Sequence, residues 1–142
     1  MQVRDIMRPD VVTIEPGESA ALAARLLARH NVGALPVCSD QGVLQGILSD
    51  RDIILRCVAA EESPQDLTVG EIMTRYPSAV APEDDIRQAA QLMSRQQIRR
   101  LPVVEQGKVV GMVSLGDLAK CGRYEMEVSR ALTEISENVR QP

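Results

Sequence analysis

The sequence repeats itself, and this repeat limits the possible folds more than any other feature. A shift of 66 positions places VRDIM (3–7) on VGEIM (69–73), and LPV (35–37) on LPV (101–103). Matches at nearly constant spacing indicate that one supersecondary unit occurs twice. We therefore predict two copies of one unit, at residues 1–60 and 69–122. A polar linker, residues 61–68, joins them, and a tail, residues 123–142, follows.

Each copy closes on the same short motif. GILSDRD (46–52) and GMVSLGD (111–117) both read glycine, two apolar residues, serine, two variable residues and aspartate. Ser49 and Ser114 stand at the end of an expected strand, where serine is a favoured N-cap of a following helix. The aspartate three residues later approximates a capping box. A pair of helix caps is one interpretation of the motif, and a pair of ligand clamps is the other.

The residues between these landmarks predict an α+β fold. Each copy has the order β-α-β-β-α, and its three strands cannot bury both faces of a sheet alone. The two copies are therefore expected to pack sheet to sheet with pseudo-two-fold symmetry. The expected elements are opening helices (3–7, 69–73), extended pieces (11–14, 78–81), helices within 16–31 and 82–97, first strands (34–38, 101–105), second strands (43–49, 108–114) and closing helices that begin at the motif serine.

Apolar residues at helical spacing predict the buried faces of the helices. The tail is expected to form an amphipathic helix, which needs an apolar surface on its own domain or on another subunit. The residues at this spacing are Ala23, Leu26, Leu27 and His30 in the first copy, Ile86, Ala89, Ala90 and Met93 in the second, and Val128, Leu132, Ile135 and Val139 in the tail.

Composition excludes several classes of function. The net charge of −4 and the pI near 5.0 argue against nucleic-acid binding. No apolar stretch approaches the roughly 20 residues of a membrane span, and the first ten residues lack the apolar run of a signal peptide. A cytoplasmic protein is expected. Neither a phosphate-binding GxxxxGK loop nor a dinucleotide GxGxxG motif occurs, so ATP hydrolysis and Rossmann-type binding have no support.

The chain also offers no obvious catalytic or metal site. Its cysteines, Cys38, Cys57 and Cys121, stand far apart without a CxxC motif, which favours reduced, buried thiols. His30 is the one histidine, so we expect no metal ion. No nucleophile and base stand close together in the sequence. We therefore predict that the protein is not an enzyme, and an enzyme that uses one of the cysteines is the weakest alternative.

The repeated unit, its LPV strand and the Gly-x-x-Ser-x-x-Asp motif resemble a tandem cystathionine-β-synthase (CBS) domain pair, also called a Bateman module. The resemblance covers residues 1–122 and is greatest to small bacterial proteins in which the pair carries no catalytic or transporter domain. Such pairs bind AMP, ADP, ATP or S-adenosyl compounds in two clefts between the repeats, and many form disc-shaped dimers. The resemblance thus implies a regulatory module with an adenine-nucleotide ligand.

The resemblance assigns ligand contacts to the motif. The serine is expected to contact phosphate or ribose and the aspartate to hold the ribose hydroxyls, which designates Ser49, Asp52, Ser114 and Asp117. The physical chemistry agrees, because a carboxylate accepts hydrogen bonds from a ribose diol. A helix start also offers unpaired N–H groups to a phosphate. The cap and the clamp are therefore compatible.

Arginines near the motif are candidate phosphate contacts. Arg99 and Arg100 precede the second LPV strand, where the first copy has Gly33 and Ala34. The guanidinium fork suits phosphate recognition, and the pair resembles the phosphate-contacting positions of nucleotide-binding CBS pairs. Arg51, inside the first motif, is a third candidate. A solvated surface charge is the alternative for all three.

The extended pieces are the candidate contacts of the base. Val12, Thr13, Ile14 and Val80 are designated, and family members often use a threonine at the position of Thr13. Its counterpart Ala79 is a departure from that pattern. Ile14 and Val80 are equally suited to simple burial in the core.

The residue patterns and the resemblance together imply a non-catalytic sensor of energy or metabolites that binds AMP, ADP, ATP or a related adenosyl ligand, with no catalytic cofactor. It is expected to form a homodimer and to act on an unknown regulated protein. Because the two copies have different neighbouring residues, we expect two clefts of unequal affinity. A ligand-independent dimeric scaffold, or a protein-interaction module that uses the tail helix, is the alternative function.

Overall fold

The computed structural model describes residues 1–139 and divides the chain into two compact units. Unit 1 consists of Met1–Val11, Ser78–Gln106 and the chain from Val110 on, and unit 2 of Val12–Pro77 and Gly107–Val109. Each unit therefore contains a segment from the other sequence copy. The predicted boundaries are defined by sequence similarity, whereas the two units are defined by contacts between residues. The predicted boundaries therefore stay a prediction.

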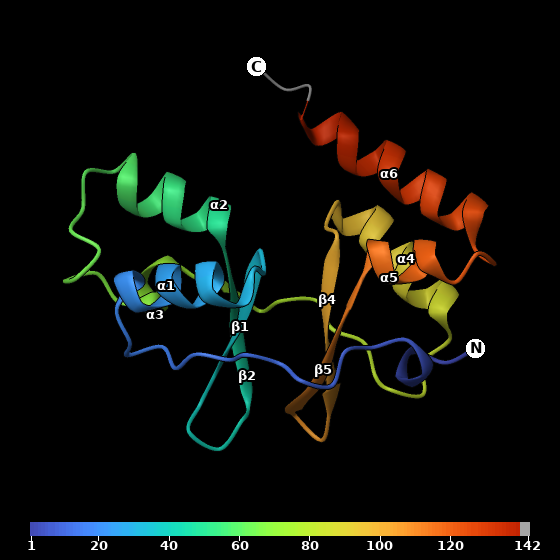
Figure 1. Cartoon of the computed structure of the whole chain (residues 1–142), viewed down its shortest axis with the longest axis horizontal. Helices are drawn as coiled ribbons and strands as arrows, with labels where there is room; N and C mark the ends of the chain where they lie inside the picture. The colour runs from blue at the N-terminus through green and yellow to red at the C-terminus, as the bar shows by residue number, and fades with distance from the viewer. Residues whose placement is uncertain (140–142) are drawn as a thin grey trace. The chain divides into compact units, whose positions relative to one another are not determined.

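Unit 2 contains a three-stranded antiparallel sheet. Figure 1 labels β1 and β2 of this sheet. The sheet order is β1-β2-β3, with Ala34 paired to Ser49 at one end of β1 and β2. The elements are α1 (Ala20–His30), β1 (Ala34–Cys38), β2 (Leu44–Ser49), α2 (Asp50–Ile53), its π-helical continuation η2 (Ile54–Val58), α3 (Val69–Ile72) and β3 (Thr74–Arg75).

Unit 1 repeats this plan around the β4-β5 hairpin and adds the tail helix. Its first element is a short 3-10 helix, which occupies the position in the repeat that α3 occupies in unit 2. The elements are η1 (Val3–Asp5), α4 (Ile86–Gln96), β4 (Arg100–Glu105), β5 (Lys108–Ser114), α5 (Leu115–Lys120) and α6 (Glu125–Val139).

The extended pieces expected at 11–14 and 78–81 are shorter than predicted. Each makes a single parallel bridge, Ile14 to Val37 and Val80 to Val103. A proline follows two residues after each bridge, at Pro16 and Pro82. Proline has no N–H to donate to a sheet, so the pairing does not extend beyond the bridge.

Each opening segment pairs with the last strand of the other sequence copy. Arg8 forms an antiparallel bridge with Met112 of β5, in unit 1. Thr74 of β3 pairs with Ile47 of β2, in unit 2. Because Arg8 matches Thr74 and Ile47 matches Met112 in the repeat, the two exchanges are equivalent.

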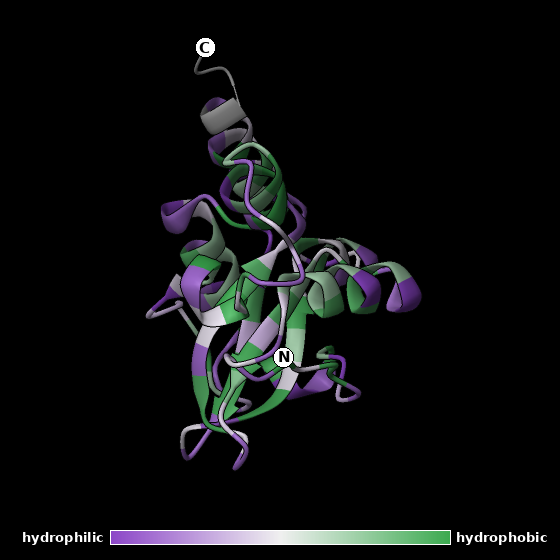
Figure 2. Cartoon of the chain, turned by 90° about the vertical axis from the view of Figure 1, so that its left-hand side faces the viewer, coloured by the Kyte–Doolittle hydropathy of each residue, from purple (hydrophilic) through white to green (hydrophobic). Residues whose placement is uncertain are grey.

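Each unit has its own cluster of buried apolar side chains. Figure 2 shows hydrophobic colour concentrated on the strands and polar colour on the loops. The periodic residues predicted for α4 are all buried, whereas Leu26 of α1 is half-buried and His30 is exposed, because α1 turns its last residues to solvent. The mutual packing of the two sheets stays a prediction. The fully buried large side chains include Leu35, Val37, Leu48 and Val69 in unit 2, and Ile86, Met93, Leu101 and Leu118 in unit 1.

The tail helix α6 packs on its own unit, against α4 and α5 (Figure 1). Val128, Ala131 and Ile135 are buried in the core of unit 1. Leu132, predicted on the same face, is 42% exposed, because at about 100° per residue it lies beyond Val128, at the edge of the face that Val128, Ala131 and Ile135 bury. The side chain of Val139 lies outside the described residues. Of the two surfaces that the sequence left open, the helix uses the one on its own domain.

Candidate functional site

The motif serines and aspartates form two capping boxes with the same geometry. In the first, Asp52 N donates to Ser49 Oγ at 3.1 Å and Ser49 N donates to Asp52 Oδ2 at 2.9 Å. In the second, Asp117 N donates to Ser114 Oγ at 3.1 Å and Ser114 N donates to Asp117 Oδ2 at 2.9 Å. The predicted helix caps are confirmed.

The helix starts offer less to a phosphate than the sequence suggested. In the first motif, Asp50 N donates to Gly33 O at 3.0 Å, and Arg51 N donates to Asp50 Oδ1 at 2.8 Å. Together with the cap, these bonds engage the first three N–H groups of α2. In the second motif, Leu115 N donates to Arg99 O at 2.8 Å. Side chains, above all the two carboxylates, are therefore the main polar groups that these motifs leave available.

Each motif aspartate uses one carboxylate oxygen for the cap and directs the other to an arginine. Asp52 Oδ1 lies 3.8 Å from Arg56 Nη1, and Asp117 Oδ1 accepts a hydrogen bond from Arg8 Nε at 3.2 Å. The aspartate side chains are 14% and 9% exposed respectively. Two mostly buried carboxylates, each fixed by a backbone N–H and faced by a cation, can still accept hydrogen bonds through their remaining lone pairs.

Sequence analysis missed Arg8 and Arg56. Arg56 follows Asp52 by four residues on a helix, which is a spacing at which charges pair. That signal was available. Arg8 lies 109 residues from Asp117 along the chain, and only the exchange of opening segments brings the two together.

The predicted phosphate contacts are exposed. Arg99 is next to the second motif through its carbonyl bond to Leu115, and Arg100 begins β4. Arg51 is exposed on α2 between Ser49 and Asp52. These positions suit a ligand contact and a solvated surface charge equally, so the assignment stays a prediction.

The predicted base contacts divide into two groups. Ile14 and Val80 are 5% and 6% exposed and belong to the cores of unit 2 and unit 1, which is the alternative that the sequence left open. Val12 is half-buried and Thr13 is exposed. Val12 and Thr13 therefore have more surface available for a ligand.

The cysteines differ in burial. Cys38 and Cys57 are buried, as predicted, and Cys121 is half-buried. Burial raises the pKa of the Cys38 thiol above its usual value of 9.0, which disfavours the nucleophilic thiolate. Within residues 1–139, no group of three or more His, Cys, Asp or Glu side chains is placed to hold a metal ion. In the same part of the chain, no helix has the length and apolar character that crossing a membrane requires.

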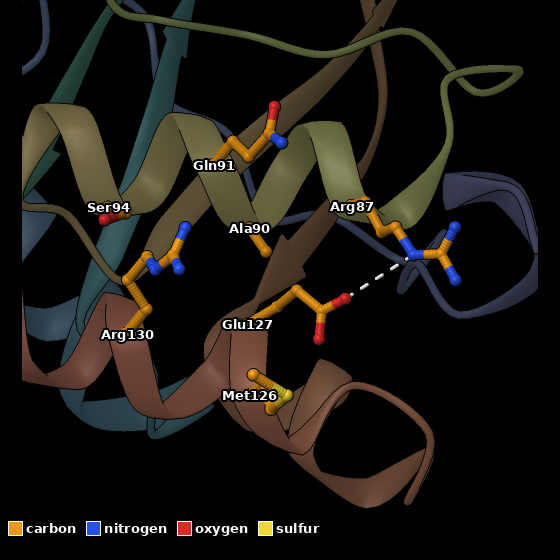
Figure 3. Close-up of a pocket in the computed structure, with 7 residues that line it drawn as sticks. All are labelled: Arg87, Ala90, Gln91, Ser94, Met126, Glu127 and Arg130. Carbon is orange, nitrogen blue, oxygen red and sulfur yellow. Dashed lines mark ion pairs between the residues drawn. The ribbon is translucent and has the colours of Figure 1, made fainter.

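A cavity of about 290 Å³ lies between α4 and α6 in unit 1, and sequence analysis did not predict it (Figure 3). Arg87 Nε and Glu127 Oε2 form an ion pair at its margin, 3.4 Å apart. None of the predicted site residues lines it. Its lining comes from two helices that only the tertiary fold brings together, namely from Arg87, Ala90, Gln91, Ser94, Met126, Glu127 and Arg130.

Known proteins are similar to this chain in sequence and in fold. The profile of the CBS domain matches residues 3–59 and 69–123. The CBS domain-containing protein YhcV of Bacillus subtilis (strain 168) is 44% identical over 134 residues, which cover 94% of each chain.

Two solved structures have the same fold. The CBS domain pair of protein MJ0100, in complex with 5′-methylthioadenosine and S-adenosyl-L-methionine, is 29% identical with a TM-score of 0.78, and the match covers 88% of this chain and 98% of that one. Hypoxic Response Protein I, with two coordinated zinc ions, is 34% identical with a TM-score of 0.79, and the match covers 84% and 98%. The recognition made from the repeat is confirmed: the chain belongs to the CBS-domain family and carries two CBS repeats.

Proposed function

We propose that this CBS pair is a non-catalytic regulatory module that binds an adenine nucleotide, or a related adenosyl compound, through Asp52 and Asp117. The observation that carries the proposal is the matched pair of capped carboxylates, 14% and 9% exposed, each with one oxygen directed to an arginine. A capping box alone needs neither the second oxygen nor a cation beside it.

The chemistry of a ribose fits this arrangement. A vicinal diol supplies two O–H donors, and a carboxylate can accept both. The backbone N–H of the motif serine fixes the orientation of each carboxylate before the ligand arrives, which lowers the entropic cost of binding. The nearby arginines Arg51, Arg99 and Arg100 carry charge that is complementary to phosphate.

The finer identity of the ligand belongs to this proposal as well. The structure of the MJ0100 pair with two adenosyl ligands supports the adenosyl class. AMP, ADP and ATP are the ligands that we propose, because three exposed arginines lie in or next to the two motifs.

Binding is tested by thermal unfolding of the full chain with and without AMP, ADP, ATP and S-adenosylmethionine. A ligand at a hundred times its Kd stabilises the native state by about 2.7 kcal/mol, so Tm must rise. The variants Asp52→Asn and Asp117→Asn should each reduce the shift, and the double variant should abolish it.

Asp84→Asn is the matched control for these variants. Asp84 Oδ2 accepts from Ala81 N at 2.8 Å, so this aspartate makes the same kind of cap outside the motif. Asp84→Asn should retain the ligand-induced shift. An unchanged Tm of the wild type at millimolar ligand, or a full shift in the double variant, would contradict the proposal.

We further propose that the protein self-associates through unit 2. Ile54, Leu55 and Val58 are 58%, 49% and 65% exposed on the helix formed by α2 and η2, and neighbouring exposed apolar side chains of this size are typical of interfaces. The same surface would serve a ligand-independent scaffold. Nucleotide binding separates the two functions, since the scaffold predicts no change in Tm.

A further inference from the structure

We propose that Arg8 is a specificity residue of the second motif, which makes that motif prefer anionic adenine nucleotides to neutral adenosine. The inference rests on the proposed function. It goes beyond that function because it assigns a residue outside the repeated motif and predicts a difference in ligand charge between the two motifs.

The backbone holds Arg8 in place beside the motif. Arg8 N donates to Met112 O at 2.8 Å, and Met112 N donates to Arg8 O at 3.0 Å. Met112 is two residues before Ser114, so this bridge fixes the arginine at the end of β5 that carries the motif. Gly111 permits the approach, because a Cβ there would lie 2.7 Å from Met7 Sδ and 3.1 Å from Arg8 O.

The side chain of Arg8 is only partly engaged. Its Nε contacts Asp117 Oδ1 at 3.2 Å, and its side chain is 65% exposed, whereas that of Asp117 is 9% exposed. A guanidinium has five N–H donors, and this contact uses one of them. Within residues 1–139, no other hydrogen bond of the Arg8 side chain is present. Arg8 thus offers solvated donors directly beside the carboxylate that we assign to the ribose.

The first motif has no cation at the position equivalent to Arg8. Thr74 occupies the position of Arg8, opposite Ile47 of β2. The cation near Asp52 is Arg56, whose Nη1 donates to Ile72 O at 2.9 Å and to Met73 O at 3.3 Å. Arg56 is therefore tied to backbone carbonyls through Nη1, whereas Arg8 makes no bond to a backbone carbonyl of the described residues through its side chain and is the more exposed of the two, at 65% against 49%.

Charge explains the expected selectivity. AMP and adenosine share the ribose and the base, so Asp117 treats both alike. Only AMP carries a phosphate, and it does so on the same sugar that the carboxylate holds. An arginine beside that carboxylate adds a charge-assisted interaction for AMP and none for adenosine. Arg8 should therefore change the ratio of the two affinities.

Calorimetric titration with AMP and with adenosine tests this, in the full chain carrying Asp52→Asn so that only the second motif reports. Arg8→Gln should weaken AMP binding about tenfold, the ratio that corresponds to about 1.4 kcal/mol, and should leave adenosine binding within about twofold. Arg8→Lys should recover part of the loss. In the Asp117→Asn background, Thr74→Arg should raise the preference of the first motif for AMP.

Arg4→Gln is the matched control. Arg4 lies in the same opening segment, is 53% exposed and pairs with Glu83 at 3.5 Å, so the variant removes the same charge away from the motif. It should leave both affinities unchanged. Far-UV circular dichroism and Tm verify that each variant is folded.

Three results would overturn the assignment. Equal losses of AMP and adenosine binding in Arg8→Gln would mean that Arg8 only orients Asp117. Tighter AMP binding would mean that Arg8 competes with the ligand for the carboxylate. Loss of all binding in Asp52→Asn, with binding retained in Asp117→Asn, would leave only the first motif as a site. If the wild type bound no nucleotide at all, the proposed function would fail first, and this inference with it.

Discussion

Met73 Sδ lies 2.6 Å from the point at which a Cβ on Gly46 would stand. The carbonyl oxygen of Thr74 is also close, at 2.8 Å. A glycine is thus required here because Met73 and Thr74, in the segment that leads into β3, pack closely on β2. The backbone angles of Gly46 do not themselves require it. The sequence is consistent with a close backbone approach at this glycine, and the structure shows that Met73 and Thr74 make it.

Gly46→Ala should therefore destabilise the protein by about 1–3 kcal/mol, the usual cost of forcing extra atoms into a packed site. Gly17→Ala is the control, because nothing lies within 4 Å of a Cβ at that position. Urea unfolding followed by far-UV circular dichroism measures both, since the chain has no tryptophan. Equal stabilities of the two variants would contradict the proposed close packing.

The cap and the ligand role of the motif serine are separable by substitution. Ser114→Ala removes the acceptor for Asp117 N and should cost about 1 kcal/mol of stability without any ligand. Ser49→Ala should cost a similar amount, because its bond has the same length. If either serine also contacts the nucleotide, its variant will in addition bind AMP more weakly than the wild type, as measured by titration with AMP. A variant with unchanged stability would show that the cap contributes nothing.

The tail helix is part of the core of unit 1. Ile135→Ala should cost about 2–4 kcal/mol, because the side chain is 6% exposed among apolar neighbours. Leu132→Ala, three residues earlier and 42% exposed, should change the free energy of unfolding by less than about 0.5 kcal/mol. Urea unfolding compares them. Similar effects of the two variants would mean that α6 does not pack as described.

Because α6 packs into the core of unit 1, a deletion of the tail is a poor test of its role in self-association. Removing residues 123–142 exposes the core of unit 1, so a change in the mass of the protein in solution would report unfolding as well as lost assembly. Point variants on the exposed surface are the better test of self-association.

The first such variant is Val58→Asp, on the surface formed by Ile54, Leu55 and Val58. It should convert a dimer to a monomer in light scattering and leave the far-UV circular dichroism of a folded chain, because the side chain is 65% exposed. Tm should fall only by the stabilisation that association itself provides. Leu132→Asp, on an exposed position of α6, is the control and should leave the mass unchanged. A monomeric wild type, or a dimer unaffected by Val58→Asp, would refute an interface at this surface.

Cys38 gives a pH dependence of defined sign. Its pKa is raised in the folded state by burial, so the folded protein favours the neutral thiol. The contribution of the buried neutral thiol to the free energy of unfolding is fully present below pH 9.0, the usual pKa of the thiol in an unfolded chain. This contribution is lost as the pH rises above that value, because the unfolded chain then ionises first. From about pH 8 to about pH 10.5, the free energy of unfolding should fall less steeply in Cys38→Ala than in the wild type. Parallel slopes would contradict the assigned burial of this thiol.

Local signals predicted most of the fold. The apolar spacing of α4 identified Ile86, Ala89, Ala90 and Met93 as core residues, and all four are buried. The Ser-x-x-Asp pattern predicted both capping boxes, because a cap involves residues only three positions apart.

Long-range contacts could not be read in the same way. Nothing in the sequence around Arg8 indicates that it lies beside Asp117, since the contact depends on which strand the opening segment joins. Leu132 fits the apolar spacing of the tail but lies at the margin of its contact with the core. Ile14 and Val80 illustrate a third limit, because one apolar residue suits a base contact and a core position equally well.

The exchange of opening segments has a consequence for the history of this chain. A protein with a single copy of the repeat would lack the strand partner that Arg8 or Thr74 supplies to the other copy. Two such molecules would complete each other by donating their openings reciprocally, and fusion of the duplicated gene would convert that exchange into one between halves of the same polypeptide. Duplication would also free one of the two positions to change, which is how a threonine and an arginine could come to stand at equivalent places.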